Sequence, residues 1–242
     1  MILNTRFNPT MNGPLHIGHV FNILVNRTEA ERHQGKFGIR FDDNQRANVW
    51  MYGWDKIKSF IDSVKEDMEW LGIVPDWYSR QSEWEGRIAD LLENEFHYQC
   101  SEAHFGYPYV PDVIGIDQVW YPYTERLTCE KVIMDHLEGI RWVIRGYDLL
   151  VEDCFYRFFT DKFGLPTPYM TYIPRLIFEG DVVSKTDGRF PVNRFREKGM
   201  HPSELIARLA QDCLTQEGWL VEHVKAHPVL GSWADEVLHG IP

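Results

Sequence analysis

The stretch NPTMNGPLHIGH at residues 8–19 constrains the fold most, because it turns the chain sharply between two regular segments. Before it, residues 2–7 predict a short buried strand, which the prolines and glycine of the stretch bring to an end. After it, apolar residues at helical spacing predict a helix from residue 15 towards residue 31, and residues 36–41 predict a second strand. This order of elements predicts a right-handed parallel unit, whose ligand site lies beyond the carboxyl ends of its strands.

Two histidines and a glycine fall in the first turn of the predicted helix. The amino terminus of a helix presents unpaired amide groups and the positive end of the helix dipole, so it attracts anions such as phosphate. His16 and His19 share one helix face, so both can donate hydrogen bonds to the same phosphate, while Gly18 lets another group lie against the backbone. The pattern suits a nucleoside triphosphate. In the alternative, one histidine caps the helix and the other is exposed.

The composition is typical of one compact catalytic domain with an appendage. With 242 residues and 44% hydrophobic content the chain can bury a substantial core, and no segment is apolar over the length that a membrane helix needs. The first residues lack a basic stretch followed by an apolar core, so we expect no signal peptide and a cytoplasmic location. The scattered cysteines predict buried free thiols and no structural zinc; they are Cys100, Cys129, Cys154 and Cys213.

The charge pattern argues against a broad nucleic-acid surface. With 25 basic and 36 acidic residues the formal net charge is −11, which repels polyanions on average. The densest basic run is more typical of a solvated face than of a phosphate track; it comprises Arg189, Arg194, Arg196 and Lys198. The chain has no internal repeat and no low-complexity segment, so we expect one continuous fold.

Residues 6–19 resemble the signature of class I aminoacyl-tRNA synthetases, in particular the glutamyl and glutaminyl branch. Further segments resemble the same branch, in the same order and at compatible spacing, from residue 4 to about residue 212. They are RFDD at 40–43, EDMEWLG at 66–72, DHLEGI at 135–140 and VVSK at 182–185, the last similar to the mobile VMSK loop of the glutaminyl enzymes. Agreement of several moderate signals in one order is stronger than any single motif.

The resemblance implies an α/β fold with a Rossmann-like doubly wound parallel sheet, the class I synthetase catalytic domain. Its implied parts are a first half at residues 1–100, a reduced insertion at 101–123, a second half at 124–180, and a Ser-Lys loop with a small helical subdomain at 181–242. A helix is expected around residues 203–214 of that subdomain, and no anticodon-binding domain is expected. The insertion lacks the CxC element of the zinc-binding version in glutamyl-queuosine synthetases. Its aromatic residues can stack on a base or pack together: Tyr107, Tyr109, Trp120, Tyr121 and Tyr123.

The resemblance also implies the chemistry, which is activation of an amino acid by ATP, with Mg²⁺ accompanying the triphosphate, as an adenylate with release of pyrophosphate. His16 and His19 would stabilise the phosphates, and Ser184 and Lys185 on the Ser-Lys loop would close over them as further catalytic residues. The implied ATP-binding residues are Thr10, His16, Gly18, His19 and Lys185. Val182 replaces the first lysine of the commoner KMSK version, a change that glutaminyl enzymes tolerate. Such catalysis rests on alignment and electrostatics, and the sequence offers no credible nucleophilic serine or cysteine.

The residues implied to bind the amino acid are Arg6, Asn8, Asp42 and Arg145. Asp42 matches the acid that holds the substrate's α-ammonium, and Arg6 matches an arginine that contacts the substrate; the alternatives are a strand-end salt bridge and a helix cap. Glutamyl enzymes resemble this chain with an arginine at Arg145, where glutaminyl enzymes have an uncharged side chain. Because burying a guanidinium without a negative partner is costly, two arginines in one pocket favour an acidic substrate such as glutamate.

Two positions depart from the branch and leave a different acidic or larger substrate open: Leu127, where a substrate-contacting tyrosine is expected, and Lys131, where glutamyl enzymes often have a neutral residue. The reduced insertion and the negative charge favour a tRNA acceptor recognised through a small surface, or an acceptor that is not a full tRNA. The alternatives are a minimal glutamyl-tRNA or glutamyl-queuosine tRNA synthetase, a different nucleotidyl transferase with an HxGH element, and a non-catalytic binding module. The nucleotidyl-transferase alternative is opposed by Asp42, residues 66–72 and the Ser-Lys loop. The binding-module alternative is opposed by the retained histidines and the Ser-Lys pair.

Overall fold

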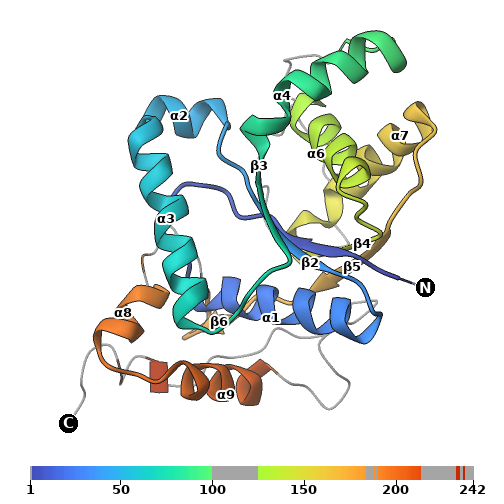
Figure 1. Ribbon diagram of the computed structural model, residues 1–242. Helices are drawn as coiled ribbons and strands as arrows, with labels where there is room; N and C mark the ends of the chain where they lie inside the picture. Colours follow the sequence, from blue (N-terminus) through green and yellow to red (C-terminus); the bar gives the residue numbers. More distant parts are fainter. Residues whose placement is uncertain are drawn as a thin grey trace.

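A computed structural model describes residues 2–99, 125–183, 188, 190–213, 233, 234 and 237. Parallel strands form its central layer (Figure 1): β1 (Thr5–Phe7), β2 (Phe37–Phe41), β3 (Trp77–Arg80), β4 (Trp142–Gly146) and β5 (Tyr169–Ile173). β2 pairs with β1 and β3, β4 pairs with β5, and a parallel bridge between Asn4 and Ile140 joins β1 to β4. The spatial order is therefore β3-β2-β1-β4-β5, and the strand order reverses between β1 and β4. This arrangement confirms the predicted α/β fold with a doubly wound parallel sheet.

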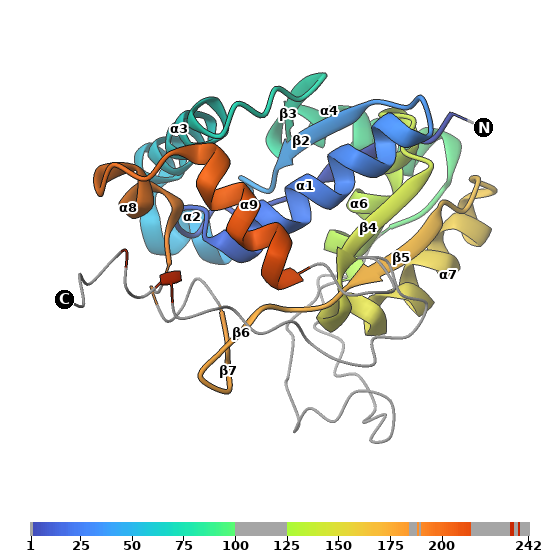
Figure 2. The same cartoon turned by 90° about the horizontal axis from the view of Figure 1, so that it is seen from below.

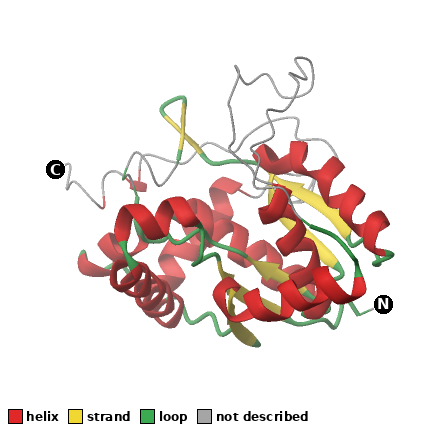
Figure 3. Ribbon diagram, turned by 90° about the horizontal axis from the view of Figure 1, so that it is seen from above, coloured by secondary structure: helices red, strands yellow, loops and turns green. Residues whose placement is uncertain are grey.

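Helices cover both faces of the strand layer (Figure 3). On one face lies α1 (Ile17–Arg32), and α9 (Pro202–Cys213) packs against it (Figure 2). On the other face lie α4 (Gln81–Asp90), α6 (Glu125–Leu137) and α7 (Asp153–Phe163). The other helical segments are α2 (Arg46–Tyr52), α3 (Trp54–Trp70), a π-helical turn η1 (Leu91–Glu95), a 3-10 segment η2 (Tyr147–Glu152) and α8 (Val192–Glu197).

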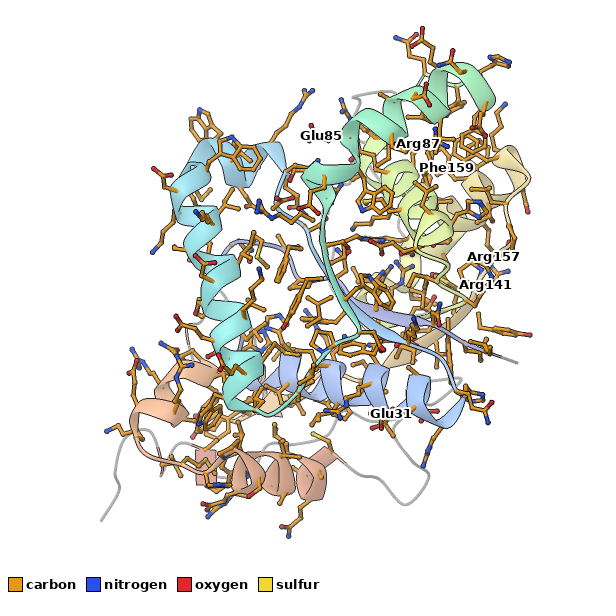
Figure 4. All side chains as sticks on the ribbon, in the orientation of Figure 1. Glu31, Glu85, Arg87, Arg141, Arg157 and Phe159 are labelled. Carbon is orange, nitrogen blue, oxygen red and sulfur yellow. The ribbon has the colours of Figure 1, made fainter. Side chains whose placement is uncertain are left out.

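Each face of the layer has its own apolar core. Trp142 and Ile144 of β4 belong to the core that contains the buried residues of α1 and α3, whereas Val143 belongs to the core beneath α6 and α7. Phe159, labelled in Figure 4, is fully buried in this second core. Because alternate residues of a strand point to opposite faces, a strand covered on both sides reads as a continuous apolar run, as WVI in β4 does.

The order of strand, helix and strand predicted from residues 2–41 is confirmed, but β1 begins only at Thr5 and Ile2 is exposed. α1 begins two residues later than predicted and ends at Arg32. Gly35 is required at the turn that follows, because a Cβ atom there would lie 2.0 Å from the carbonyl oxygen of Leu3. Gln34 precedes it in the left-handed region at a φ of 54°. This tight turn brings the chain directly from α1 into β2 beside β1.

The second half of the chain ends in a short hairpin and two helices. The hairpin consists of β6 (Ile177–Phe178) and β7 (Asp181–Val182), and α9 confirms the helix expected near residues 203–214. Residues 184–187 and the predicted insertion at 101–123 lie outside the described residues.

The cysteine prediction is partly wrong. Cys129 and Cys213 are buried free thiols, as expected, but Cys154 is exposed. The buried face of α7 is formed by Tyr156, Phe159 and Phe163, at helical spacing, and Cys154 lies two residues before this stripe and therefore off it. Cys100 falls outside the described part of the chain, and within that part no helix is long and apolar enough to cross a membrane.

Candidate active site

A cleft of about 570 Å³ lies at the switch point, beyond the carboxyl ends of β1 and β4. Its walls are the loop after β1, the first turns of α1, η2, and the ends of β4 and β5. It is where an open parallel sheet offers a ligand site. Seven of the predicted site residues line it together: Arg6, Asn8, Thr10, His16, Gly18, His19 and Arg145. Ser184 and Lys185 lie outside the described residues, and the cleft wall as described does not include Asp42.

The two histidines cap α1 reciprocally. Gly18 donates its backbone N–H to Nδ1 of His16, and His16 donates its own backbone N–H to Nδ1 of His19, each over 3.1 Å. The ring centroids lie 3.7 Å apart. Because both Nδ1 atoms act as acceptors, the proton of each neutral imidazole is on Nε2. The alternative of one capping and one exposed histidine is wrong, since both rings cap the helix and both line the cleft.

The group that lies against the backbone at Gly18 is the ring of His16. A Cβ atom at this position would lie 2.9 Å from Cε1 and 3.0 Å from Nδ1 of the His16 ring. Glycine therefore leaves room for the capping ring itself, which folds back over the first turn of α1. Any side chain here would displace His16 from its cap.

A buried cluster of ionic side chains, here called the arginine network, lies beneath the cleft and comprises Arg6, Arg40, Asp135 and Glu138. Arg6 binds Asp135 through two hydrogen bonds of 2.9 and 2.8 Å, and Arg40 contacts Oδ1 of Asp135 at 2.8 Å and Oε2 of Glu138 at 3.0 Å. Two hydroxyl groups also donate hydrogen bonds to these carboxylates: Tyr156 to Asp135 at 2.6 Å and Ser79 to Glu138 at 2.5 Å. Two guanidiniums and two carboxylates make the network neutral, and every carboxylate oxygen has a donor or cation against it.

The network joins β1, β2, β3, α6 and α7 and reaches the cleft through Arg6 and Asn8. Burial alone would raise the pKa of Asp135, but the charges of Arg6 and Arg40 outweigh it and hold that pKa at about 2. Arg40 also donates from Nε to Oδ1 of Asn8 at 2.7 Å, which fixes the orientation of the amide. Its amide nitrogen is therefore the part of Asn8 that can donate to a ligand.

A second ionic cluster forms part of the cleft wall and is called here the Arg145 cluster: Arg145, Glu152, Asp153 and Tyr172. One terminal nitrogen of Arg145 contacts Oε2 of Glu152 at 2.9 Å, and the other binds Asp153, which also accepts a hydrogen bond from the Tyr172 hydroxyl. Burial opposes the charge of Arg145, but Glu152 and Asp153 outweigh it and raise the pKa of the guanidinium. Arg145 and Glu152 are both more than nine-tenths buried.

These contacts overturn the reason given for an acidic substrate. The expectation of glutamate assumed that Arg6 and Arg145 lack negative partners, yet Arg6 binds Asp135 and Arg145 binds two acids. Neither guanidinium therefore needs a substrate carboxylate to balance its charge. Sequence reasoning missed Glu152 and Asp153, although their position seven and eight residues after Arg145 was visible.

Asp42 lies just behind the cleft, where a bridge pairs it with the cleft residue Thr10. Gln45 donates from Nε2 to Oδ2 of Asp42 at 2.9 Å. Oδ1 is buried and has no hydrogen-bond partner among the described residues. Of the two departures, Lys131 of α6 lines the cleft and Leu127 is not part of its described wall.

Comparison with known families identifies the fold that carries this site. Residues 2–104 match the family model described as tRNA synthetases class I (E and Q), catalytic domain. These residues belong to that synthetase family. The match contains the first strand, the histidine cap, Asp42 and α3.

Curated relatives and solved structures extend the comparison. Glutamine–tRNA ligases of Yersinia pestis (strain Pestoides F) and Yersinia pseudotuberculosis (serotype O:1b, strain IP 31758) are each 32% identical over 114 residues, or 46% of this chain and 18% of those ligases. The chain thus spans under a fifth of the length of these relatives. A glutamate tRNA ligase from Elizabethkingia meningosepticum CCUG26117, solved in complex with its amino acid, has a TM-score of 0.72 at 17% identity over 98% of this chain and 68% of its own. The glutamate-tRNA synthetase of Elizabethkingia anophelis has a TM-score of 0.71 at 17% identity, over 98% of this chain and 69% of its own. The synthetase fold therefore continues beyond residue 104 into the second half of the chain.

The basic run predicted at residues 189–198 is partly paired with the acidic end of α3. Arg194 and Lys198 of this run are exposed, while Arg196 contacts Glu66 at 3.4 Å and Asp67 at 3.6 Å. Asp67 is buried, and this burial raises its pKa to about 7 against the opposing charge of Arg196. Arg196 thus serves a contact between α3 and α8, whereas Arg189 lies outside the described residues.

Proposed function

We propose that this chain activates an amino acid of the glutamate and glutamine class with ATP, forming an aminoacyl-adenylate and releasing pyrophosphate. The aminoacyl group then passes to a hydroxyl or amine of an acceptor, which is a tRNA recognised through a small surface or another molecule. The observation that supports this most directly is the pair of capping imidazoles in the switch-point cleft of a class I E and Q domain.

In the first step, a carboxylate oxygen of the amino acid attacks the α-phosphorus of ATP. The bond between that phosphorus and the oxygen bridging to the β-phosphate breaks, and pyrophosphate leaves with the bonding electron pair. His16 and His19 donate from Nε2 to the phosphates, and the amides at the start of α1 add to the same positive potential. The histidines keep their protons throughout, because the step needs no proton transfer to the enzyme.

Asp42 is the proposed partner of the substrate's α-ammonium. Its Oδ1 is buried without a hydrogen-bond donor in the described part of the chain, and an ammonium group would supply one. Gln45 holds the other oxygen and so orients the carboxylate. Asn8 would donate its amide nitrogen to the substrate beside Arg6, since its oxygen is already bound to Arg40.

ATP enters as its Mg²⁺ complex, and the metal is part of the substrate. Magnesium ions in nucleotide sites keep several waters and bind mainly through phosphates. Among the described residues no group of three or more His, Cys, Asp or Glu side chains could hold a metal. Ser184 and Lys185 would close over the phosphates from the segment after β7, as the family resemblance implies.

The direct test is amino-acid-dependent exchange of labelled pyrophosphate into ATP by the full chain, with a panel of amino acids and with or without total tRNA. We expect exchange with glutamate or glutamine and none without an amino acid. Absence of exchange under every condition contradicts the proposal. Exchange driven by another nucleophile in place of an amino acid would favour the nucleotidyl-transferase alternative.

The acceptor needs a second measurement, in which the labelled amino acid is followed into tRNA or into small molecules. A minimal glutamyl-tRNA synthetase would attach the label to the 3′ end of tRNA, in a linkage that base hydrolyses. A glutamyl-queuosine type enzyme would attach it to a modified base, so the label would survive removal of the 3′ nucleotide. Label that stays in the small-molecule fraction would favour the acceptor other than tRNA.

A further inference from the structure

The lining of the cleft contains both apolar and charged residues. Ile173, Leu176 and Val183, from the end of β5 and the residues around the hairpin, are apolar. Arg145 and Glu152, from the end of β4 and η2, are charged. A flat, weakly polar purine base gains most from apolar lining residues, and the phosphates from the start of α1. Arg145 and Glu152 are then available to the side chain of the amino acid.

The Arg145 cluster leaves one donor and one acceptor unused. Nε of Arg145 and Oε1 of Glu152 are both buried, and neither has a hydrogen-bond partner in the part of the chain that the structure describes. Buried polar atoms without partners cost free energy, which a ligand can recover by bonding to them. The ligand group must therefore accept from a guanidinium N–H and donate to a carboxylate oxygen.

The net charge of the Arg145 cluster also favours a ligand group that both accepts and donates hydrogen bonds. One guanidinium and two carboxylates leave a net charge of −1, because Tyr172 is a neutral donor whose pKa is raised by burial and by Asp153. A side-chain carboxylate has only acceptor oxygens and would approach a cluster that is already negative. A side-chain amide offers both a carbonyl oxygen and an NH₂ group, which match the unused donor and acceptor.

We propose that Glu152 and Asp153 set the amino-acid specificity, because they hold Arg145 in an internal ion pair and leave a wall that binds a side-chain amide and repels a side-chain carboxylate. This inference rests on the proposed function. Glu152 acts by direct contact with the substrate, and Asp153 is a positioning residue that acts through Arg145. Lys131 and Arg175 also line the cleft, and an acidic side chain would bind through cations such as these instead.

Pyrophosphate exchange with glutamine and with glutamate, in the presence of total tRNA, tests the inference. We expect kcat/KM to be at least tenfold higher for glutamine, and the isosteric variant Glu152→Gln to lower the glutamine-to-glutamate ratio at least tenfold. Asp153→Asn, at a partly exposed position, should lower the same ratio with less risk to folding. Glu204→Gln removes an exposed carboxylate of α9 and is the matched control, for which the ratio should not change.

Binding of the non-hydrolysable glutaminyl and glutamyl sulfamoyl-adenosine analogues, measured by calorimetry, separates the possible failures. If neither analogue binds and no exchange occurs, the proposed function itself fails and the inference falls with it. If exchange occurs but glutamate is preferred, or the ratio is unchanged in both variants, the inference alone is overturned. A preference for glutamate that is lost in Lys131→Met would assign the specificity to that lysine. An equal rise in the KM for ATP with every amino acid would assign Glu152 to the nucleotide base.

Discussion

The arginine network and the Arg145 cluster are both built around buried arginines and acids, yet they differ in charge and in how fully their carboxylate oxygens are paired. The network pairs two guanidiniums with two carboxylates and leaves no carboxylate oxygen without a donor or cation. The Arg145 cluster carries one extra negative charge and leaves Nε of Arg145 and Oε1 of Glu152 unused. A neutral network whose carboxylate oxygens are all paired braces a fold, whereas a cluster beside a cleft that leaves a carboxylate oxygen unpaired is suited to a ligand.

The largest effect is expected from removing Arg40, the fully buried centre of the brace. Arg40→Met leaves Asp135 and Glu138 buried with less positive charge, and breaking a buried ionic network in this way costs about 3–5 kcal/mol of unfolding free energy. Urea denaturation followed by circular dichroism measures the loss. Arg87→Met is the control, because Arg87 (Figure 4) pairs with Asp90 on the exposed surface of α4 and should change stability by under about 1 kcal/mol. Equal small losses in both variants would mean that the network is not a brace.

Substitution of a histidine in the cleft should have the opposite effect, because it should lower activity and leave stability nearly unchanged. Asparagine at His19 keeps an acceptor oxygen near the position of Nδ1, so the cap on the His16 amide can persist, but it has no donor at the position of Nε2. We expect His19→Asn to lower kcat for pyrophosphate exchange about 10²–10³-fold and to change stability by under about 1 kcal/mol.

His19→Gln provides the complementary test, since its amide can reach the position of Nε2 but not that of Nδ1. It should keep more activity and lose more stability than His19→Asn. A uniform loss of both properties in the two variants would indicate that His19 serves only as a cap.

The fold of residues 2–41 could be predicted from sequence because each of its determinants is local. Apolar periodicity marks α1, and Gly35 marks the turn that must approach the backbone of Leu3. The site at the start of α1 was predictable for the same reason: the cap depends on residues within one turn. Even there, spacing alone could not show that the group lying against Gly18 is the ring of His16.

The partners of Arg6 and Arg145 could not be predicted, because they depend on how distant elements meet. Asp135 is 129 residues from Arg6 along the chain and reaches it only after α6 packs across the strand layer. Glu152 is close to Arg145 in sequence, but the contact requires η2 to fold back over the end of β4. The charge argument for an acidic substrate failed on this point, since the sequence shows the charges and not their pairing.

A buried acid with poor partners extends the comparison to α3. Among the residues that the structure describes, Arg196 at 3.6 Å is the one ion-pair partner of Asp67, and burial raises the pKa of Asp67 to about 7. Its pKa in the folded state is thus above the unfolded value, so the folded state holds the proton more tightly and stability falls as the pH rises from about 4 to about 7. Asp67→Asn removes this loss of stability. The unfolding free energy of the variant minus that of the wild type should therefore rise by about 2–3 kcal/mol between pH 5 and pH 8.

Urea denaturation of both proteins at each pH measures the difference, and Glu66→Gln is the control because Glu66 is an exposed partner of the same Arg196. A constant difference between Asp67→Asn and the wild type across this range would show that Asp67 is ionised at pH 5 in the folded protein.

The smallest effects are expected from the two tyrosines, one beside the arginine network and one in the Arg145 cluster. They test the difference between these two clusters most directly. Tyr156→Phe removes the donor to Asp135, which is buried on all sides, so we expect a loss of about 1–3 kcal/mol. Tyr172→Phe removes a donor to Asp153, whose side chain is 17% exposed, and water can replace the lost bond there; we expect under about 1 kcal/mol. The paired urea curves decide between the two clusters, because a larger loss for Tyr172→Phe would make the Arg145 cluster the brace and the arginine network the more adaptable of the two.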